Sequence, residues 1–481
     1  MKVMKKILTM LFVMMMVLGM GTTVYAADDG EINITGAKPE QTYKIYRILD
    51  LESYDTTTGN YAYKANSTWK TFLESTEIKG VYVEFNGEYV TWKTGADAST
   101  FAKLALKYAN DHTITADENK TTSATDTTVN FTGLQLGYYL VDSSVGALCS
   151  LDTTNKTVDI TEKNDIPTVE KKITDSTGAN PVESNTASIG DTVYFKTTIA
   201  VKAGAQNYVL HDKMGDGLTF DSSSVVVKLK DGTGENVLTE GTGNDYLLSN
   251  TTTTGDGCTF HIEFLKCDNL KENDEITITY SATLNENAEI GTTGNKNETW
   301  LKYGDDKTTT HKETFTKTFE IPVFKYHVVK DTSGTATNTG LAGVTFSLNK
   351  EDGTLVKLEK TTAVLTAKDS YRVTNGTSAT LETNASGQFD IKGLAAGKYK
   401  LTEVSAPAGF NKLAKPIEIE IAEDGTYKVD GVSTTGDIKI ENKTGTILPS
   451  TGGMGTTIMY IVGAVLLIGS CVVLVTKKSA K

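Results

Sequence analysis

Residues 393–410 read GLAAGKYKLTEVSAPAGF, and the alternation within this stretch decides the fold class. Tyr399, Leu401 and Glu403 occupy every second position, so they point to one face of a β-strand. Short runs rich in Thr, Val, Ile and Tyr recur along the chain, broken by Gly, Asn and Asp. This pattern predicts a mainly β protein made of immunoglobulin-like β-sandwich domains in tandem.

The length of 481 residues allows about three such domains. The first, residues 27–163, contains one helical pattern, DASTFAKLALKYAND at 97–111, with apolar residues spaced as on one helix face. We therefore expect a small helical insertion in that domain. The second and third domains, residues 164–318 and 319–445, both open with Ile-Pro, a few strand residues and a lysine, and both close with a strand that carries asparagine.

Both ends of the chain have the features of processed segments. Lysines precede an apolar run near the N-terminus, and small residues then predict signal-peptidase cleavage after Ala26, so residues 1–26 form the predicted signal peptide. The last segment, residues 446–481, starts with LPSTG and continues with an apolar run, 458–475, long enough for a membrane-crossing helix, and a basic tail. The pentapeptide consists of Leu448, Pro449, Ser450, Thr451 and Gly452.

This order of features resembles the sorting signal of Gram-positive surface proteins. The resemblance implies that a sortase cleaves between Thr451 and Gly452 and transfers the threonine carbonyl to an amine. The protein would then be exported, pass through a membrane-bound precursor, and end covalently attached to peptidoglycan at the cell surface. The alternative is a plain membrane anchor that is never cut.

Composition excludes several kinds of function. The net charge is −13, and removal of three lysines at each end makes it more negative, which argues against a nucleic-acid partner. The five histidines are scattered, no cysteine or serine stands in a nucleophile motif, and no ligand set has metal spacing. We therefore expect that the chain is not an enzyme and that it binds no cofactor and no metal. Cys258 and Cys267 flank one apparent strand, whose extension would keep them from forming a disulfide.

Alternation places a lysine, an acid and an asparagine on apolar strand faces in each of the last two domains. Burial of such ions costs several kcal/mol each unless they pair or change protonation. Burial lowers a lysine pKa and raises a carboxyl pKa, so a neutral amine and a neutral acid become the favoured pair. The amine could then displace ammonia from the asparagine amide and form an isopeptide bond. The residues are Lys171, Asp212 and Asn297 in the second domain, and Lys325, Glu403 and Asn442 in the third.

Residues 393–410 resemble the E-box strand of Cna-B-like pilin domains, and LAGVTF from Leu341 resembles their second strand. The second domain, through YVLHDKMGDGLTF and GNKNETWLKYG, resembles the pilin isopeptide domain that uses Asp. The resemblance implies Lys325 and Lys171 as nucleophiles and the roles of assisting acid and acceptor for their acids and asparagines. The rivals for these roles are Lys330, Lys172 and Asn295.

In the first domain, GLQLGYYLVDS copies the spacing of the E-box stretch, but Ser143 stands where Glu403 stands, and EINITG has no lysine. We expect no isopeptide bond there.

The layout as a whole resembles a sortase-assembled backbone pilin. This resemblance implies a pilus shaft of copies of this chain, joined through Thr451 to a lysine near the end of the first domain. The nearest match is Lys163 in TEKN, which lacks the Tyr-Pro of the usual motif. Expected partners are pilin-specific and housekeeping sortases, other copies, tip and basal pilins, and an unknown surface ligand. The alternatives are an ancillary pilin or a wall-anchored adhesin that stays monomeric.

Overall fold

The structure is a computed structural model that describes residues 30–55, 60–144, 146–148, 157–250, 256–304, 307–361, 368–445 and 459–470. The predicted cleavage after Ala26 and the LPSTG motif lie outside these residues. Contacts divide the chain into two compact units, the first made mainly of residues up to Phe319 and the second mainly of residues from Glu320 onward. Unit 1 contains the predicted first and second domains, and unit 2 contains the predicted third domain.

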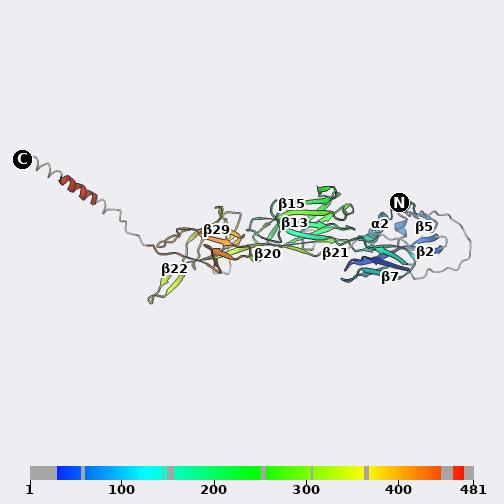
Figure 1. Cartoon of the computed structure of the whole chain (residues 1–481), viewed down its shortest axis with the longest axis horizontal. Helices are drawn as coiled ribbons and strands as arrows, with labels where there is room; N and C mark the ends of the chain where they lie inside the picture. The colour runs from blue at the N-terminus through cyan, green and yellow to red at the C-terminus, as the bar shows by residue number, and fades with distance from the viewer. Residues whose placement is uncertain are drawn as a thin grey trace, which may run out of the picture. The chain divides into compact units, whose positions relative to one another are not determined.

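The predicted first domain contains two sheets (Figure 1). One has the strand order β10-β1-β7, and the other has the order β4-β5-β3-β2-β8-β9 with β6 paired to β2. The strands are Gly30–Thr35 (β1), Thr42–Asp55 (β2), Asn60–Ala65 (β3), Val83–Asn86 (β4), Tyr89–Trp92 (β5), Glu118–Thr121 (β6), Thr128–Leu134 (β7), Gly137–Ser143 (β8), Gly146–Leu148 (β9) and Thr157–Thr161 (β10).

The predicted helix is present as α2, Ala98–Asp111, in addition to a one-turn helix α1, Lys70–Leu73. Phe101 and Ala105 of α2 are buried, and Leu104 and Tyr108 pack against the same core cluster. The apolar stripe of α2 therefore contributes to the core of the domain, as its periodicity predicts.

The predicted second domain also has two sheets. One has the order β11-β13-β19-β15-β16, and the other runs β17-β18-β14-β20 to the first part of β22, with β12 and β21 at its margins. The elements are Thr168–Thr174 (β11), Ser184–Thr186 (β12), Thr192–Ala200 (β13), Val209–Met214 (β14), Leu218–Asp231 (β15), Gly234–Val237 (β16), Tyr246–Asn250 (β17), Phe260–Phe264 (β18), the 3-10 turn Cys267–Asn269 (η1), Glu275–Leu284 (β19), Gly291–Tyr303 (β20), Lys307–Thr308 (β21) and Lys312–Lys330 (β22).

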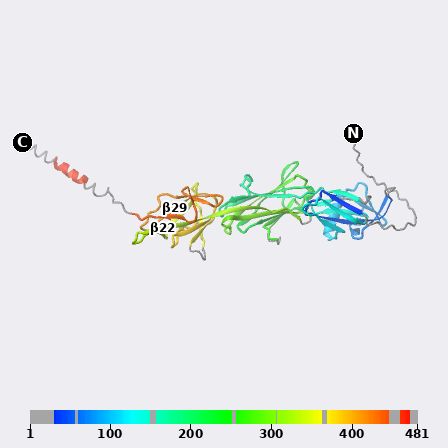
Figure 2. The same cartoon turned by 60° about the horizontal axis from the view of Figure 1, so that its bottom comes forward.

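Unit 2 is built in the same way (Figures 1 and 2). One sheet has the order β27-β24-β29-β30-β31-β32, and the other joins β28, β26 and β25 to the second part of β22, which also pairs with β23 and β33. The strands are Ala336–Gly340 (β23), Thr345–Lys350 (β24), Leu358–Thr361 (β25), Asp369–Val373 (β26), Leu381–Glu382 (β27), Gln388–Leu394 (β28), Gly397–Ser405 (β29), Ile417–Ile421 (β30), Tyr427–Val429 (β31), Val432–Thr434 (β32) and Ile438–Glu441 (β33).

These paired sheets confirm the mainly β architecture of tandem sandwiches. β22 adds a feature that the sequence did not suggest, because this strand is continuous from Lys312 to Lys330 across the residue at which the two units divide.

The C-terminal part of the chain is described only over residues 459–470, which are helical. The predicted membrane-crossing run, 458–475, extends beyond them. Among the residues that the structure describes, no helix combines the length and apolarity needed to cross a membrane.

Candidate functional site

The third domain brings its predicted lysine, acid and asparagine together in its core. β22 and β33 are parallel neighbours, with Lys325 opposite Ile440. The chain continues from β33 so that the amide N–H of Asn442 donates to the carbonyl of Tyr326 at 2.9 Å. Glu403 lies on β29, which belongs to the other sheet of the domain. Figure 2 labels both β22 and β29. The first and last strands thus lie side by side, and the acid faces them from the opposite layer.

All three side chains are buried and in contact. Their residues are 0%, 2% and 2% exposed for Lys325, Glu403 and Asn442. The Lys325 ammonium nitrogen Nζ donates to Oδ1 of Asn442 and lies 3.3 Å from Oε2 of Glu403. Nδ2 of Asn442 donates to Oε1 of Glu403 at 2.6 Å. The carboxyl group therefore bridges the amine and the amide nitrogen.

The surroundings of this triad disfavour a charged amine. Burial lowers the pKa of Lys325, although the nearby Glu403 carboxyl opposes that shift. The Phe346 ring lies 5.9 Å from Nζ, and the backbone N–H of Leu413 donates to Oε2 of Glu403 at 3.2 Å. The pocket is therefore apolar on the lysine side and hydrogen-bonded on the carboxyl side.

The second domain assembles a related cluster from three different strands. Lys171 lies on β11, Asp212 on β14 and Asn297 on β20, and all three are at most 2% exposed. Nζ of Lys171 is 2.6 Å from Oδ2 of Asp212. Burial lowers the pKa of Lys171 and raises that of Asp212, so each group is shifted toward its neutral form.

The sequence analysis missed one member of this cluster, Tyr280 on β19. Its hydroxyl donates to Oδ2 of Asp212 at 2.5 Å, and it accepts hydrogen bonds from Lys171 and, at 3.2 Å, from Nδ2 of Asn297. Burial, together with the Asp212 carboxylate, raises the pKa of Tyr280 well above its ordinary value. A neutral phenol thus links the amine, the acid and the amide.

Two polar atoms of the second cluster have no hydrogen-bond partner among the described residues. These are Oδ1 of Asp212 and Oδ1 of Asn297, both buried. A buried acceptor without a donor is costly, which marks this pair as a functional candidate.

The alternative residues for the nucleophile and acceptor roles either bond to other groups or are exposed. Lys172 pairs with Glu183 at 2.8 Å on the domain surface, and Lys330 is exposed. Asn295 is buried, but its Oδ1 accepts from the backbone N–H of Glu289 at 2.8 Å. The geometry thus favours Lys171, Lys325 and Asn297 over these alternatives.

The first domain has a different polar cluster at the matching place. Ser143 is buried, and its neighbours Tyr43 and Glu162 are buried as well. Burial raises the pKa of Glu162. The inward residues of β1 are Ile32 and Ile34, in place of a lysine.

Lys163 follows β10 and is exposed, while its neighbour Glu162 is buried. Its amine is therefore accessible from solvent.

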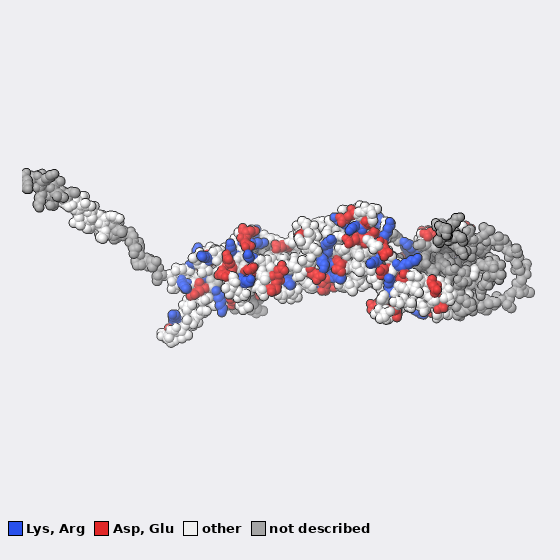
Figure 3. Space-filling view, in the orientation of Figure 1, with Lys and Arg blue, Asp and Glu red and all other residues white. Residues whose placement is uncertain are grey.

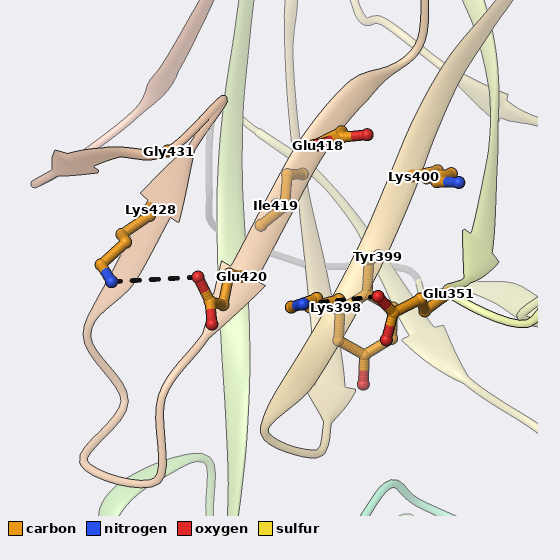
Figure 4. A pocket seen from close by; sticks show the side chains of 9 residues that line it. All are labelled: Glu351, Lys398, Tyr399, Lys400, Glu418, Ile419, Glu420, Lys428 and Gly431. Atoms are coloured by element: carbon orange, nitrogen blue, oxygen red, sulfur yellow. Dashed lines mark hydrogen bonds and ion pairs between the residues drawn. The ribbon is translucent and has the colours of Figure 1, made fainter.

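The surface offers a pocket in unit 2, over β29, β30 and β31, and its lining mixes basic and acidic side chains, two pairs of which are ion pairs. Figure 4 shows Lys398 facing Glu351 and Lys428 facing Glu420, at 3.4 and 3.9 Å. On the face drawn in Figure 3, basic and acidic side chains are interspersed over the coloured part of the chain. Neither feature has the single-sign surface expected of a nucleic-acid interface.

Two protein-family models match the chain. Residues 189–307 match the Gram-positive pilin backbone subunit 2, Cna-B-like domain, and residues 324–435 match the SpaA prealbumin-like fold domain. The trypsin-resistant surface T6 protein of Streptococcus pyogenes serotype M6 is 24% identical over 281 residues, 53% of this chain and 46% of that protein. The match thus spans about half the length of that curated relative.

Two solved structures match the chain at low sequence identity. The T6 backbone pilin of serotype M6 Streptococcus pyogenes is 17% identical, with 87% of this chain and 94% of that chain covered at a TM-score of 0.50. The full-length major pilin SpaD from Corynebacterium diphtheriae is 19% identical, with 87% and 98% covered at a TM-score of 0.46. Two domains of this chain thus match family models, one of a Gram-positive pilin backbone domain and one of a prealbumin-like fold domain.

Proposed function

We propose that this chain is the structural backbone subunit of a covalently polymerised Gram-positive pilus, held together internally by two Lys-Asn isopeptide bonds. The observation that carries the proposal is the pair of buried lysine, acid and asparagine clusters in domains that match backbone pilins. Sortase would join Thr451 of one copy to Lys163 of the next, and the last copy to peptidoglycan. The domain limits are those given by the sequence, with 27–163, 164–318 and 319–445 in the mature chain.

In the third domain, the neutral amine of Lys325 attacks the amide carbon of Asn442. Glu403 contacts both reacting groups, so it can accept a proton from Nζ through one oxygen and deliver a proton to Nδ2 through the other. The C–N bond to Nδ2 breaks, ammonia leaves, and the lysine nitrogen remains bonded to the former amide carbon. Folding holds the reactants in contact, a situation in which effective molarities reach about 10⁵ M or more.

In the second domain, Lys171 attacks the amide carbon of Asn297 with Asp212 as the assisting acid, the C–N bond to Nδ2 breaks, and ammonia leaves. A proton on Oδ1 of Asp212, donated to Oδ1 of Asn297, would give both orphaned atoms a partner and would polarise the amide carbonyl. The Tyr280 hydroxyl contacts all three groups, so it can hold the amine of Lys171 and the amide of Asn297 close to each other.

The alternative is an ancillary pilin or a wall-anchored adhesin that is never polymerised. It shares the export signal, the sorting motif and the internal bonds, and differs in whether the exposed amine of Lys163 is used. The exposure of Lys163 and the match to a pilin backbone domain favour the shaft subunit.

Assembly is tested by Lys163→Ala in a native host that expresses the sortases. The unaltered protein is expected to give a ladder of detergent-resistant species on denaturing gels, because its copies are covalently joined. Lys163→Ala should leave only the single-copy form, since the acceptor amine is missing. Extracts of the cell wall, probed with an antibody to this chain, measure the result.

The matched control is Lys398→Ala, which removes another exposed lysine, on β29. Its ladder should be unchanged. A ladder that persists in Lys163→Ala would place the joint at another lysine, and single copies alone from the unaltered chain would favour the adhesin.

A further inference from the structure

Four side chains of types that bind transition metals gather at one place in the second domain. They are His211 on β14, His261 on β18, and Asp256 and Cys258 in the loop that leads into β18. One donor atom from each residue lies within 4.8 Å of all the others. His211 and His261 are far apart in the sequence, but the fold makes them direct partners in the β14–β18 ladder. Opposite residues in adjacent strands hold their Cβ atoms about 5 Å apart.

The loop aims the Asp256 carboxylate at the two imidazoles. Gly257 has φ +76°, a conformation that favours glycine, and it turns the chain between the two ligand residues. The backbone N–H of Cys258 donates to Oδ1 of Asp256 at 3.0 Å. The other oxygen, Oδ2, lies 3.2 Å from Nδ1 of His211 and 2.9 Å from Nε2 of His261.

The spacings fit a tetrahedral zinc ion. Zinc bonds of about 2.0–2.1 Å to nitrogen, 2.0–2.2 Å to oxygen and 2.3 Å to sulfur give tetrahedron edges of about 3.3 Å between N and O and about 3.6 Å between N and S. The N–O distances are 3.2 and 2.9 Å, and Sγ of Cys258 lies 3.6 Å from Nδ1 of His211. The donors therefore stand close to the positions that the ion requires.

We propose that His211, Asp256, Cys258 and His261 form a structural Zn²⁺ site that ties the loop before β18 to β14. On binding, the Cys258 thiol releases its proton to solvent and the thiolate takes a coordination position. The four ligands then carry two negative charges, which the ion balances. The set of two imidazoles, one thiolate and one carboxylate suits zinc better than Ca²⁺ or Mg²⁺, which select oxygen ligands.

The surroundings fix the orientation of one ligand and leave a path to solvent beside another. The Trp300 ring stacks on the His211 ring at 5.1 Å with an interplanar angle of 13°, which fixes its orientation. The side chain of Asp256 is 37% exposed and gives an ion a path from solvent.

A reactive cysteine is the competing interpretation of this cluster. Burial raises the pKa of the Cys258 thiol to about 12, and Asp256 adds to the shift. A thiol of that kind is a poor nucleophile without a cation to remove its proton. The residue itself is 0% exposed.

The metal site uses the opposite face of β14 from Asp212, so it does not depend on isopeptide chemistry.

Cobalt substitution tests the site in the full secreted protein, reduced and stripped of metal with a chelator. Titration with Co²⁺ should give one bound ion per chain, an intense visible spectrum typical of tetrahedral geometry, and a thiolate-to-cobalt charge-transfer band in the near ultraviolet. Zn²⁺ should abolish both signals by displacement. The absence of the tetrahedral spectrum in protein whose thiols are shown to be reduced would overturn the proposal.

Variants separate this site from adventitious binding. Cys258→Ser should lose the charge-transfer band, whereas Cys267→Ser, at the other buried free thiol, should keep it. Asp256→Asn lies at a partly exposed position that leaves the fold intact, and it should weaken Zn²⁺ binding by more than about 100-fold, because even outer-shell partners cost about 10- to 100-fold. A band that survives in Cys258→Ser, or an affinity unchanged in Asp256→Asn, would contradict the assigned ligands.

Discussion

The Glu403→Ala variant is expected to fold without the Lys325–Asn442 bond. Its mass should exceed that of the unaltered crosslinked protein, corrected for the substitution, by one molecule of ammonia. Glu403 bridges the amine and the amide in the core of unit 2, so its loss removes the proton carrier of the reaction. A crosslink that closes a loop of roughly 100 residues stabilises the folded state by about 5 kcal/mol through the unfolded chain. Intact mass and thermal unfolding of the third domain measure both effects.

The same variant leaves Nδ2 of Asn442 buried without its acceptor, which adds to the loss of stability, because an unsatisfied buried donor costs about 1–3 kcal/mol. Glu403→Gln keeps the shape of the side chain and removes only the acid, so it should also lack the bond while it disturbs packing less. Glu418→Ala, at an exposed position of β30, is the matched control and should keep both the mass and the unfolding temperature of the unaltered protein. If the Glu403→Ala protein has still lost one molecule of ammonia, the bond forms without Glu403, and the role of this acid is contradicted.

The Asp212→Ala variant is expected to lengthen under force where the unaltered protein does not. When both bonds are present, tension between Lys163 and residue 451 passes from Lys171 directly to Asn297, so the intervening chain carries no load. Without that bond the intervening chain can unfold, and at about 3.3–3.6 Å per residue it adds on the order of 400 Å of extension. Single-molecule pulling from these two attachment points measures the added length.

Asp216→Ala serves as the control for that experiment, since Asp216 is an exposed acid just beyond β14. It should show no added extension in the second domain. An equal unfolding length in the unaltered chain and in Asp212→Ala would mean that no covalent bypass exists there. A reversible domain holds only about 5–15 kcal/mol, so the difference in rupture behaviour should be large.

Local alternation was sufficient to predict the members of both triads. Lys325 and Glu403 each stand two residues from an apolar neighbour in the same strand, and Asn442 stands two residues after Ile440 of β33, so a period of two alone directs them inward. The structure buries all three and brings them into contact. The helix over Ala98–Asp111 was predictable for the same kind of reason, because its apolar stripe is a local signal.

Long-range pairing was not predictable in this way. Tyr280 shares a face with Ile276 and Ile278 on β19, where an inward tyrosine is an ordinary core residue, and nothing local marks its hydroxyl as the link between three other groups. The pairing of His211 with His261 depends on which strands are neighbours in the sheet and on their register. The spacing of Asp256, Cys258 and His261 in the sequence was the one signal that could have suggested a partial metal site.

The continuity of β22 was also not predicted from the sequence. The stretch around Ile321 contains an Ile-Pro pair, which reads as the start of a new strand because proline cannot donate to the ladder. In the structure Pro322 lies within β22, which pairs with β20 before it and with β33 at and after Val323.

The intact mass of the secreted chain, residues 27–451, tests the central claim most directly. The account predicts a mass lower than that calculated from the sequence by two molecules of ammonia, and proteolytic digestion should return two branched peptides that join Lys171 to Asn297 and Lys325 to Asn442. A folded protein with the full calculated mass, from which all four side chains are recovered free, would contradict it.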